Sequence, residues 1–192
     1  MTKGVVLASG GFEWNADLRR AFLRGPMTHP VSMETSTGDG LLMSMRAGAM
    51  LSNMREAWWI PVGVVPLESN PMGKVLVNGQ RTLPHSIMVN RRGRRFTNEA
   101  ANYNAFGGAF HVEDVSRFEY ANLPCWLVFD AKFRAKFSAG GLMPWAHTPE
   151  HKVPPDWWDH YVFRADTIEA LASKIHVPID ALKQTVINRS EE

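Results

Sequence analysis

Two short glycine-rich segments contain the residues whose types and spacing best suit ligand binding. Ala8-Ser9-Gly10-Gly11 follows an apolar run, and glycine, which has no Cβ, lets backbone approach a bound nucleotide or phosphate closely. Thr37-Gly38-Asp39-Gly40 stands where a helix is expected to begin, so backbone N–H groups and the positive dipole end favour an anionic or electron-rich ligand. Both segments also have a structural interpretation: the first as an ordinary turn, the second as a helix start capped by Asp39.

Four arginines, Arg91, Arg92, Arg94 and Arg95, crowd into five positions and raise the question of nucleic-acid binding. The chain carries 21 Lys+Arg against 19 Asp+Glu, a net charge of only +2. Glu99 follows the cluster closely, and no aromatic residues interleave with it on a basic face. We therefore expect a solvated turn with ion pairs to nearby carboxylates and no nucleic-acid partner. The alternative is that one of the four arginines is buried as a structural clamp.

Metal binding is not expected. His147 and His151 have the i,i+4 spacing of a helical pair, but Pro149 lies between them. The single cysteine, Cys125, excludes an internal disulfide and favours a reducing compartment. The start of the sequence has too short an apolar stretch for a signal peptide, and no run approaches the roughly 18 apolar residues of a membrane span. We predict a cytoplasmic protein without a membrane span.

The elements that must position the glycine-rich segments are a strand and two helices. Residues 5–8 read as a buried parallel strand that enters a tight turn. Asn15 is expected to cap a helix that ends near Leu23, and residues 36–40 to open a second, packed helix in which Gly48 allows close approach to a neighbour. Proline-punctuated segments begin after about residue 57, which predicts a domain boundary there.

The second part of the chain reads as mixed helix and strand. Residues 86–96 predict a β-hairpin with its turn at 90–93, and residues 125–129 predict a further strand. Between them, residues 98–118 are expected to form a loop with Gly107 and Gly108, followed by a helical turn. Thr167 is part of a capping-box variant before a helix, and a last helix is expected at about 178–188. The fold class is therefore α/β combined with α+β.

Three motifs in order resemble the flavoprotein superfamily of fumarate reductases and 3-ketosteroid Δ1-dehydrogenases: VVLASGGF at 5–12, STGDGLLM with AGA at 36–49, and SIMVNRRGRRFTNE at 86–99. The resemblance covers nearly all of the chain. It implies a partial, Rossmann-like FAD-binding domain at 1–57 and a capping domain that closes over substrate and flavin at 58–192. It also implies FAD as cofactor, contacted largely through backbone by six residues: Ala8, Ser9, Gly10, Gly38, Asp39 and Gly40.

The resemblance also favours one branch of this superfamily. The dicarboxylate reductases carry His-Pro-Thr just after the second motif. They also carry an arginine four residues beyond the glutamate of the Asn-Glu pair that ends the third motif. Here those places hold Ala57-Trp58-Trp59-Ile60-Pro61 and Tyr103. The ketosteroid dehydrogenases have a catalytic tyrosine after the same Asn-Glu motif, so the resemblance implies that Tyr103 is the base that removes a proton beside a ketone. Flavin N5 would accept the hydride from the adjacent carbon, and an external electron acceptor would reoxidise the flavin.

The extent of the chain and the identity of its substrate are the last points that the resemblance bears on. The Gly-x-Gly-x-x-Gly motif and the C-terminal return to the FAD domain, which are typical of the superfamily, are not found in the sequence. We therefore expect the chain to be a fragment that, by itself, neither holds FAD tightly nor turns over. The favoured substrate is a steroid-like hydrophobic ketone. The alternatives are a fumarate or enoate reductase, and a non-catalytic piece that only packs against a partner; the oligomeric state is left open.

Overall fold

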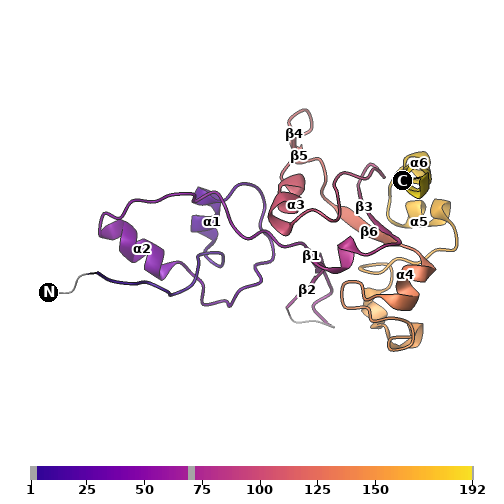
Figure 1. The fold of residues 1–192 in the computed structure, drawn as a ribbon, viewed down its shortest axis with the longest axis horizontal. Coiled ribbons are helices and arrows are strands. Elements are labelled where there is room, and N and C mark those ends of the chain that lie inside the picture. Colours follow the sequence, from indigo (N-terminus) through magenta and orange to yellow (C-terminus); the bar gives the residue numbers. More distant parts are fainter. Residues whose placement is uncertain (1–3, 69–71, 192) are drawn as a thin grey trace. The chain divides into compact units, whose positions relative to one another are not determined.

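The computed structural model describes residues 4–68 and 72–191 of the chain. These form two compact units, Met1–Ala57 and Trp58–Glu192, whose elements are labelled in Figure 1. Each unit is described by itself below. That the first belongs to an FAD-binding domain and the second to a capping domain stays a prediction.

The first unit is organised around α1, which spans Ala16–Phe22. Asn15 caps it as predicted, since its side chain accepts from the backbone N–H groups of Asp17 and Leu18, each at 3.1 Å. The Asn15 amide also donates to the Thr37 carbonyl at 3.1 Å. This one side chain therefore both starts α1 and holds the segment that leads into the second helix.

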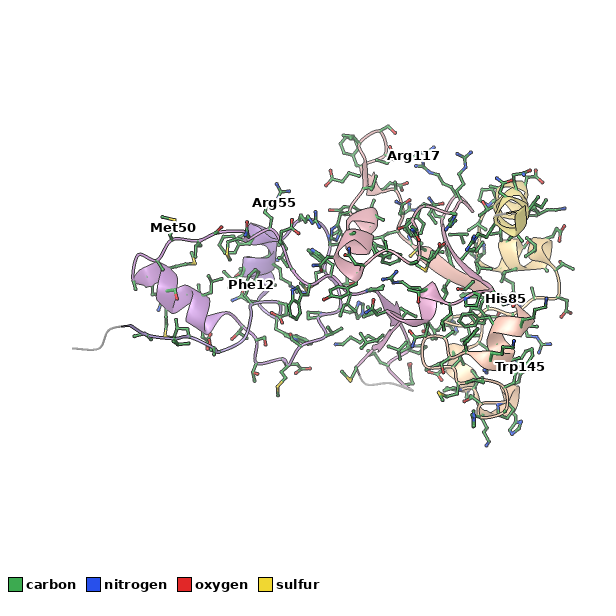
Figure 2. All side chains as sticks on the ribbon, viewed as in Figure 1. Phe12, Met50, Arg55, His85, Arg117 and Trp145 are labelled. Carbon is green, nitrogen blue, oxygen red and sulfur yellow. The ribbon has the colours of Figure 1, made fainter. Side chains whose placement is uncertain are left out.

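That second helix, α2, spans Asp39–Arg46. Its N-cap is Gly38, in the left-handed conformation and without a side-chain cap, so the interpretation of Asp39 as the cap is wrong. The expected packing is formed only in part within the described unit. Leu41 and Leu42 are half-buried, but Met45 is 39% exposed, and a Cβ on Gly48 would meet nothing within 4 Å. Figure 2 labels Met50, which follows α2 and is 95% exposed.

The strand predicted at residues 5–8 is not formed in the structure. Val5 and Val6 are 81% and 92% exposed, and no strand occurs between residues 4 and 57. A strand needs the hydrogen bonds of a neighbouring strand, and a buried parallel strand needs cover on both faces. The described part of this unit supplies neither, so the apolar run passes as irregular chain into the turn at Gly10.

The second unit contains three antiparallel strand pairs: β1 (Val62–Val64) with β2 (Lys74–Leu76), β3 (Ser86–Asn90) with β6 (Cys125–Phe129), and β4 (Glu113–Asp114) with β5 (Glu119–Tyr120). The predicted strand at 125–129 is confirmed. The predicted hairpin is right in its turn, where Gly93 has a φ of +69°, but its return is a single bridge between Val89 and Arg95. The main partner of β3 is β6, which lies 35 or more residues further along the chain. The sequence pattern does not indicate this pairing.

Helices surround these strands: α3 (Tyr103–Phe110), α4 (Ala131–Lys136), α5 (Ile168–Lys174), α6 (Ile179–Glu191) and the 3₁₀ turns η1 (Gln80–Thr82), η2 (Glu150–Lys152) and η3 (Pro155–Trp157). The helices predicted after Thr167 and Pro178 are confirmed. Where a loop was expected, α3 forms. Gly107 fits in α3 because Trp59 packs on it, and a Cβ there would lie 2.4 Å from the Trp59 Cβ.

Two apolar cores hold the second unit together. The first lies between β3, α5 and α6, and its buried residues are Ile87, Val89, Ala172, Ile175, Val177 and Leu182. The second surrounds Trp157, with Val65, Leu142 and Val153. Within the described ranges, no helix is long and apolar enough to cross a membrane.

Candidate functional site

In the first unit, the two glycine-rich segments lie against each other. A Cβ on Gly40 would lie 2.3 Å from the Ser9 Oγ, and a Cβ on Gly10 would lie 3.1 Å from the Ser36 Oγ. Gly10 also has a φ of +86°, a conformation that glycine adopts without strain. Ser9 and Gly10 therefore lie beside the segment that opens α2. The resemblance implies that both segments contact FAD, which stays a prediction.

The groups at this junction are polar and largely open. Ser9 and Asp39 are exposed, and the Asp39 Oδ1 accepts a hydrogen bond from the Thr37 Oγ1 at 3.1 Å. Because no side chain caps α2, the N–H groups of its first turn are available as donors. Donors, a hydroxyl and a carboxylate acceptor suit a ligand with phosphate and sugar hydroxyl groups, so these residues fit part of a dinucleotide such as FAD.

Gly38 has a different role from its neighbours. A Cβ there would lie 2.6 Å from the Leu18 Cδ1 and 2.8 Å from the Phe12 Cβ, and φ is +87°. Phe12 is labelled in Figure 2. Glycine at this position is thus required by packing against α1 and by the turn into α2, in addition to any contact with a ligand.

In the second unit, Tyr103 is the first residue of α3. Asn102 is the N-cap, and its side chain accepts from the Ala105 N–H at 2.9 Å. The Tyr103 side chain is half-buried. The sequence singled out this tyrosine, although not the helix that holds it.

A buried charge cluster lies immediately before Tyr103. Glu99 is 5% exposed; its Oε1 accepts from the Met88 N–H at 2.9 Å, and its carboxylate accepts from Arg95 at 2.8–3.1 Å. Burial by itself would raise the pKa of Glu99, but the hydrogen bonds from Arg95 and Met88 hold it below the ordinary value. Glu99 is therefore a fixed anion that joins β3 to this segment.

Arg81, on η1, completes the cluster. It is 3% exposed; its Nη1 donates to the Glu99 carbonyl and its Nη2 donates to the Ala101 carbonyl at 2.8 Å. Its guanidinium carbon lies 4.1 Å from the centre of the Phe106 ring. Sequence reasoning missed Arg81, because a lone arginine within a short polar segment carries no periodic or motif signal.

The arginine cluster at 91–95 behaves largely as predicted. Arg91 pairs with Glu119, Arg92 with Asp114, and Arg95 with Glu99. The alternative, in which one of the four is buried as a clamp, does not hold, since all four remain at least partly accessible. The buried arginines lie elsewhere, at Arg81 and Arg134. Among the described residues, no group of three or more His, Cys, Asp or Glu side chains could hold a metal ion.

A family model described as "FAD binding domain" matches residues 1–192. The chain belongs to this family, and FAD is the cofactor that the family implies, as predicted from the motifs. Two curated relatives are a 3-oxosteroid 1-dehydrogenase of Mycobacterium tuberculosis, 38% identical over 96% of this chain, and a 4-oxocyclohexanecarboxylate 2-dehydrogenase of Sinomonas cyclohexanicum, 35% identical over 96%. The chain spans 32% and 31% of their respective lengths.

Among solved structures, the chain is similar to the 3-ketosteroid Δ1-dehydrogenase of Sterolibacterium denitrificans in complex with 1,4-androstadiene-3,17-dione. The TM-score is 0.83 with 37% identity, over 96% of this chain and 32% of that chain. The predicted resemblance to the flavoprotein superfamily, and to its ketosteroid dehydrogenase branch in particular, is confirmed by these comparisons.

Proposed function

We propose that this chain is part of an FAD-dependent dehydrogenase that removes two hydrogens from adjacent ring carbons beside a ketone, as in 1,2-desaturation of a 3-ketosteroid. The observation that carries the proposal is the likeness over 96% of the chain to a ketosteroid dehydrogenase crystallised with a steroid dione. The named substrates of the two curated relatives also share an oxo group.

We assign residues 1–57 to the FAD-binding domain and residues 58–192 to the capping domain. The junction of Ser9 and Gly10 with the start of α2 supports the first assignment, because open N–H groups and small residues suit contact with a dinucleotide. Bound FAD supplies the hydride acceptor of the reaction. Ala8, Gly38, Asp39 and Gly40 belong to the same two segments and complete the proposed contacts.

Tyr103 is the proposed base. The reaction removes a proton from the carbon next to the ketone and a hydride from the carbon adjacent to it. Loss of the proton makes loss of the hydride easier, so a basic side chain must reach the carbon next to the ketone. A phenol is a weak base at neutral pH unless its surroundings favour the phenolate. Tyr103 is half-buried and begins α3, four residues after the buried Glu99.

The proposed substrate is a steroid-like, hydrophobic ketone, with an external acceptor that reoxidises the flavin. A smaller ring ketone that carries a carboxylate is a second candidate, favoured by the likeness to the Sinomonas enzyme. A carboxylate substrate would need a cationic partner, whereas a steroid would not. A comparison of flavin reduction by a 3-ketosteroid and by 4-oxocyclohexanecarboxylate therefore distinguishes the two candidate substrates.

The test is anaerobic flavin reduction in the longer protein of which this chain is proposed to be part, loaded with FAD and called the FAD-loaded protein below. The dehydrogenase proposal predicts that a 3-ketosteroid bleaches the visible absorption of the oxidised flavin. A fumarate or enoate reductase would instead show no bleaching with the ketosteroid, and its chemically reduced flavin would be reoxidised by fumarate. A non-catalytic piece would show neither bleaching by the ketosteroid nor reoxidation by fumarate. The result expected of a reductase and the result expected of a non-catalytic piece would each overturn the proposal.

A further inference from the structure

We propose that Arg81 is a positioning residue for Tyr103: it fixes the backbone before Tyr103 and the helix after it, and so sets where the phenol lies. This inference rests on the proposed function, since it concerns the proposed base. Arg81 belongs to η1, more than 20 residues earlier in the chain, and acts through its neighbours without needing to touch substrate or flavin.

The contacts of Arg81 lie on both sides of Tyr103. Before it, the guanidinium donates to the carbonyls of Glu99 and Ala101, the second at 2.8 Å. After it, the guanidinium lies over the Phe106 ring at 4.1 Å, and Phe106 is fully buried in α3. A single planar group therefore spans the segment from four residues before Tyr103 to three residues after it.

Other groups hold the two ends of this segment. Glu99 joins it to β3 through the Met88 N–H at 2.9 Å. On α3, the Asn104 Oδ1 accepts from the Trp59 N–H at 3.2 Å, and Gly107 packs on Trp59. Because both ends are fixed, loss of Arg81 frees chiefly the residues between them, which include Tyr103.

The chemistry of arginine explains why this position needs it. Two carbonyls and a ring face require a planar fork with several donors and a flat surface, which a lysine ammonium does not provide. The reaction is sensitive to such placement, because a displacement of about 1 Å at a catalytic group can cost on the order of 10²-fold in rate. A base held by a flexible loop would lose that advantage.

The chain offers a matched control in Arg134. This second arginine is also buried, at 7% exposed, and also donates to two carbonyls, those of Met143 and Thr148. It lies on α4, away from the contacts of α3 given above. Arg134→Lys therefore removes an equivalent buried clamp without touching the segment around Tyr103.

The experiment is ¹⁹F NMR of the full chain labelled with 3-fluorotyrosine. The sequence has three tyrosines, so three resonances are expected, and Tyr103→Phe assigns one of them. We expect Arg81→Lys to shift or broaden the Tyr103 resonance while those of Tyr120 and Tyr161 stay in place. Arg134→Lys should leave the Tyr103 resonance unchanged.

An unchanged Tyr103 resonance in Arg81→Lys, or an equal change in Arg134→Lys, would overturn the proposal. So would collapse of all three resonances in both Arg81→Lys and the second variant Arg81→Gln, because Arg81 would then hold the whole unit and not one segment. In the FAD-loaded protein, Arg81→Lys should lower kcat by roughly 10- to 100-fold, with a smaller change in KM.

The two proposals fail in different ways. If Tyr103→Phe remains fully active while Arg81→Lys still moves the Tyr103 resonance, the proposed role of Tyr103 is wrong and the positioning contact stands. If Tyr103→Phe is inactive while Arg81→Lys leaves both the resonance and kcat unchanged, the role of Tyr103 stands and the positioning by Arg81 is wrong.

Discussion

Neutralising Glu99 should destabilise the second unit by an amount that depends on how the carboxylate is replaced. Glu99→Gln keeps an oxygen for the Met88 N–H but loses the charge that Arg95 binds. Hydrogen bonds to charged groups contribute about 1.5–3 kcal/mol and neutral ones about 0.5–1.5 kcal/mol, so we expect a loss of about 1–2 kcal/mol. Glu99→Leu in addition leaves the Met88 N–H without this acceptor in a buried place, and should cost about 1–3 kcal/mol more than Glu99→Gln.

The assay is urea unfolding followed by tryptophan fluorescence, repeated from neutral to acid pH. Since the folded-state pKa of Glu99 lies below its ordinary value of 4.5, its contribution is fully present above that pH and is lost as the pH falls through the folded-state pKa. The difference between wild type and Glu99→Gln should therefore be constant at neutral pH and shrink below about pH 4.5.

The control is Glu150→Gln, which breaks an exposed ion pair with Arg164. Both side chains are more than half exposed, so the expected loss is below about 1 kcal/mol. The account of Glu99 is refuted if Glu99→Gln is as stable as wild type at neutral pH, or if the difference between the two does not shrink in acid.

Three further outcomes are expected. Leu182→Ala should lower the free energy of unfolding by about 2–5 kcal/mol in urea titrations, because Leu182 is fully buried in the core beneath β3; a loss below 1 kcal/mol would contradict this packing. In the longer protein of which this chain is part, Gly40→Ala should weaken FAD binding in fluorescence titrations, since the new Cβ would displace the Ser9 hydroxyl, whereas Gly4→Ala should have no effect. Cys125 should resist alkylation at pH 8 until the protein unfolds, because burial raises the pKa of its thiol to about 12; rapid labelling of the folded chain would disprove it.

Elements with local start signals could be predicted from the sequence. Asn15 and Thr167 cap α1 and α5 with their own side chains, and these contacts depend only on residues two or three positions ahead. The Cys125–Phe129 strand was likewise marked by its apolar and aromatic run. In each case the signal and the structure lie within one short segment.

Elements that depend on distant partners could not be predicted in the same way. The run at Val5 has the composition of a buried strand, but strand formation needs a neighbour, and the described residues 4–57 of its unit contain none. Gly107 predicts a loop by propensity, yet packing against Trp59 makes glycine suitable for a helix. The partner of β3 is β6, although the nearer residues after the turn were expected to supply it.

The candidate site likewise contains residues that a local motif indicates and one residue that depends on distant contacts. The glycine-rich segments and Tyr103 could be proposed from the sequence because they belong to recognisable motifs, and their roles stay predictions. The structure places Ser9 beside Gly40. Arg81 could not be found, because its importance arises only when η1 is placed beside the backbone of Glu99 and Ala101. Contacts of this kind, between a side chain and distant carbonyls, leave no pattern in the sequence.

The most direct test of the central claim is the rate at which a 3-ketosteroid reduces the flavin anaerobically in the FAD-loaded protein of which this chain is part, as wild type, Tyr103→Phe and the control Tyr120→Phe. The account predicts that wild type and Tyr120→Phe bleach at similar rates, and that Tyr103→Phe is slower by about 10²- to 10⁴-fold, the contribution typical of a general base. Equal rates in wild type and Tyr103→Phe, or a wild-type flavin that the ketosteroid does not reduce, would contradict it.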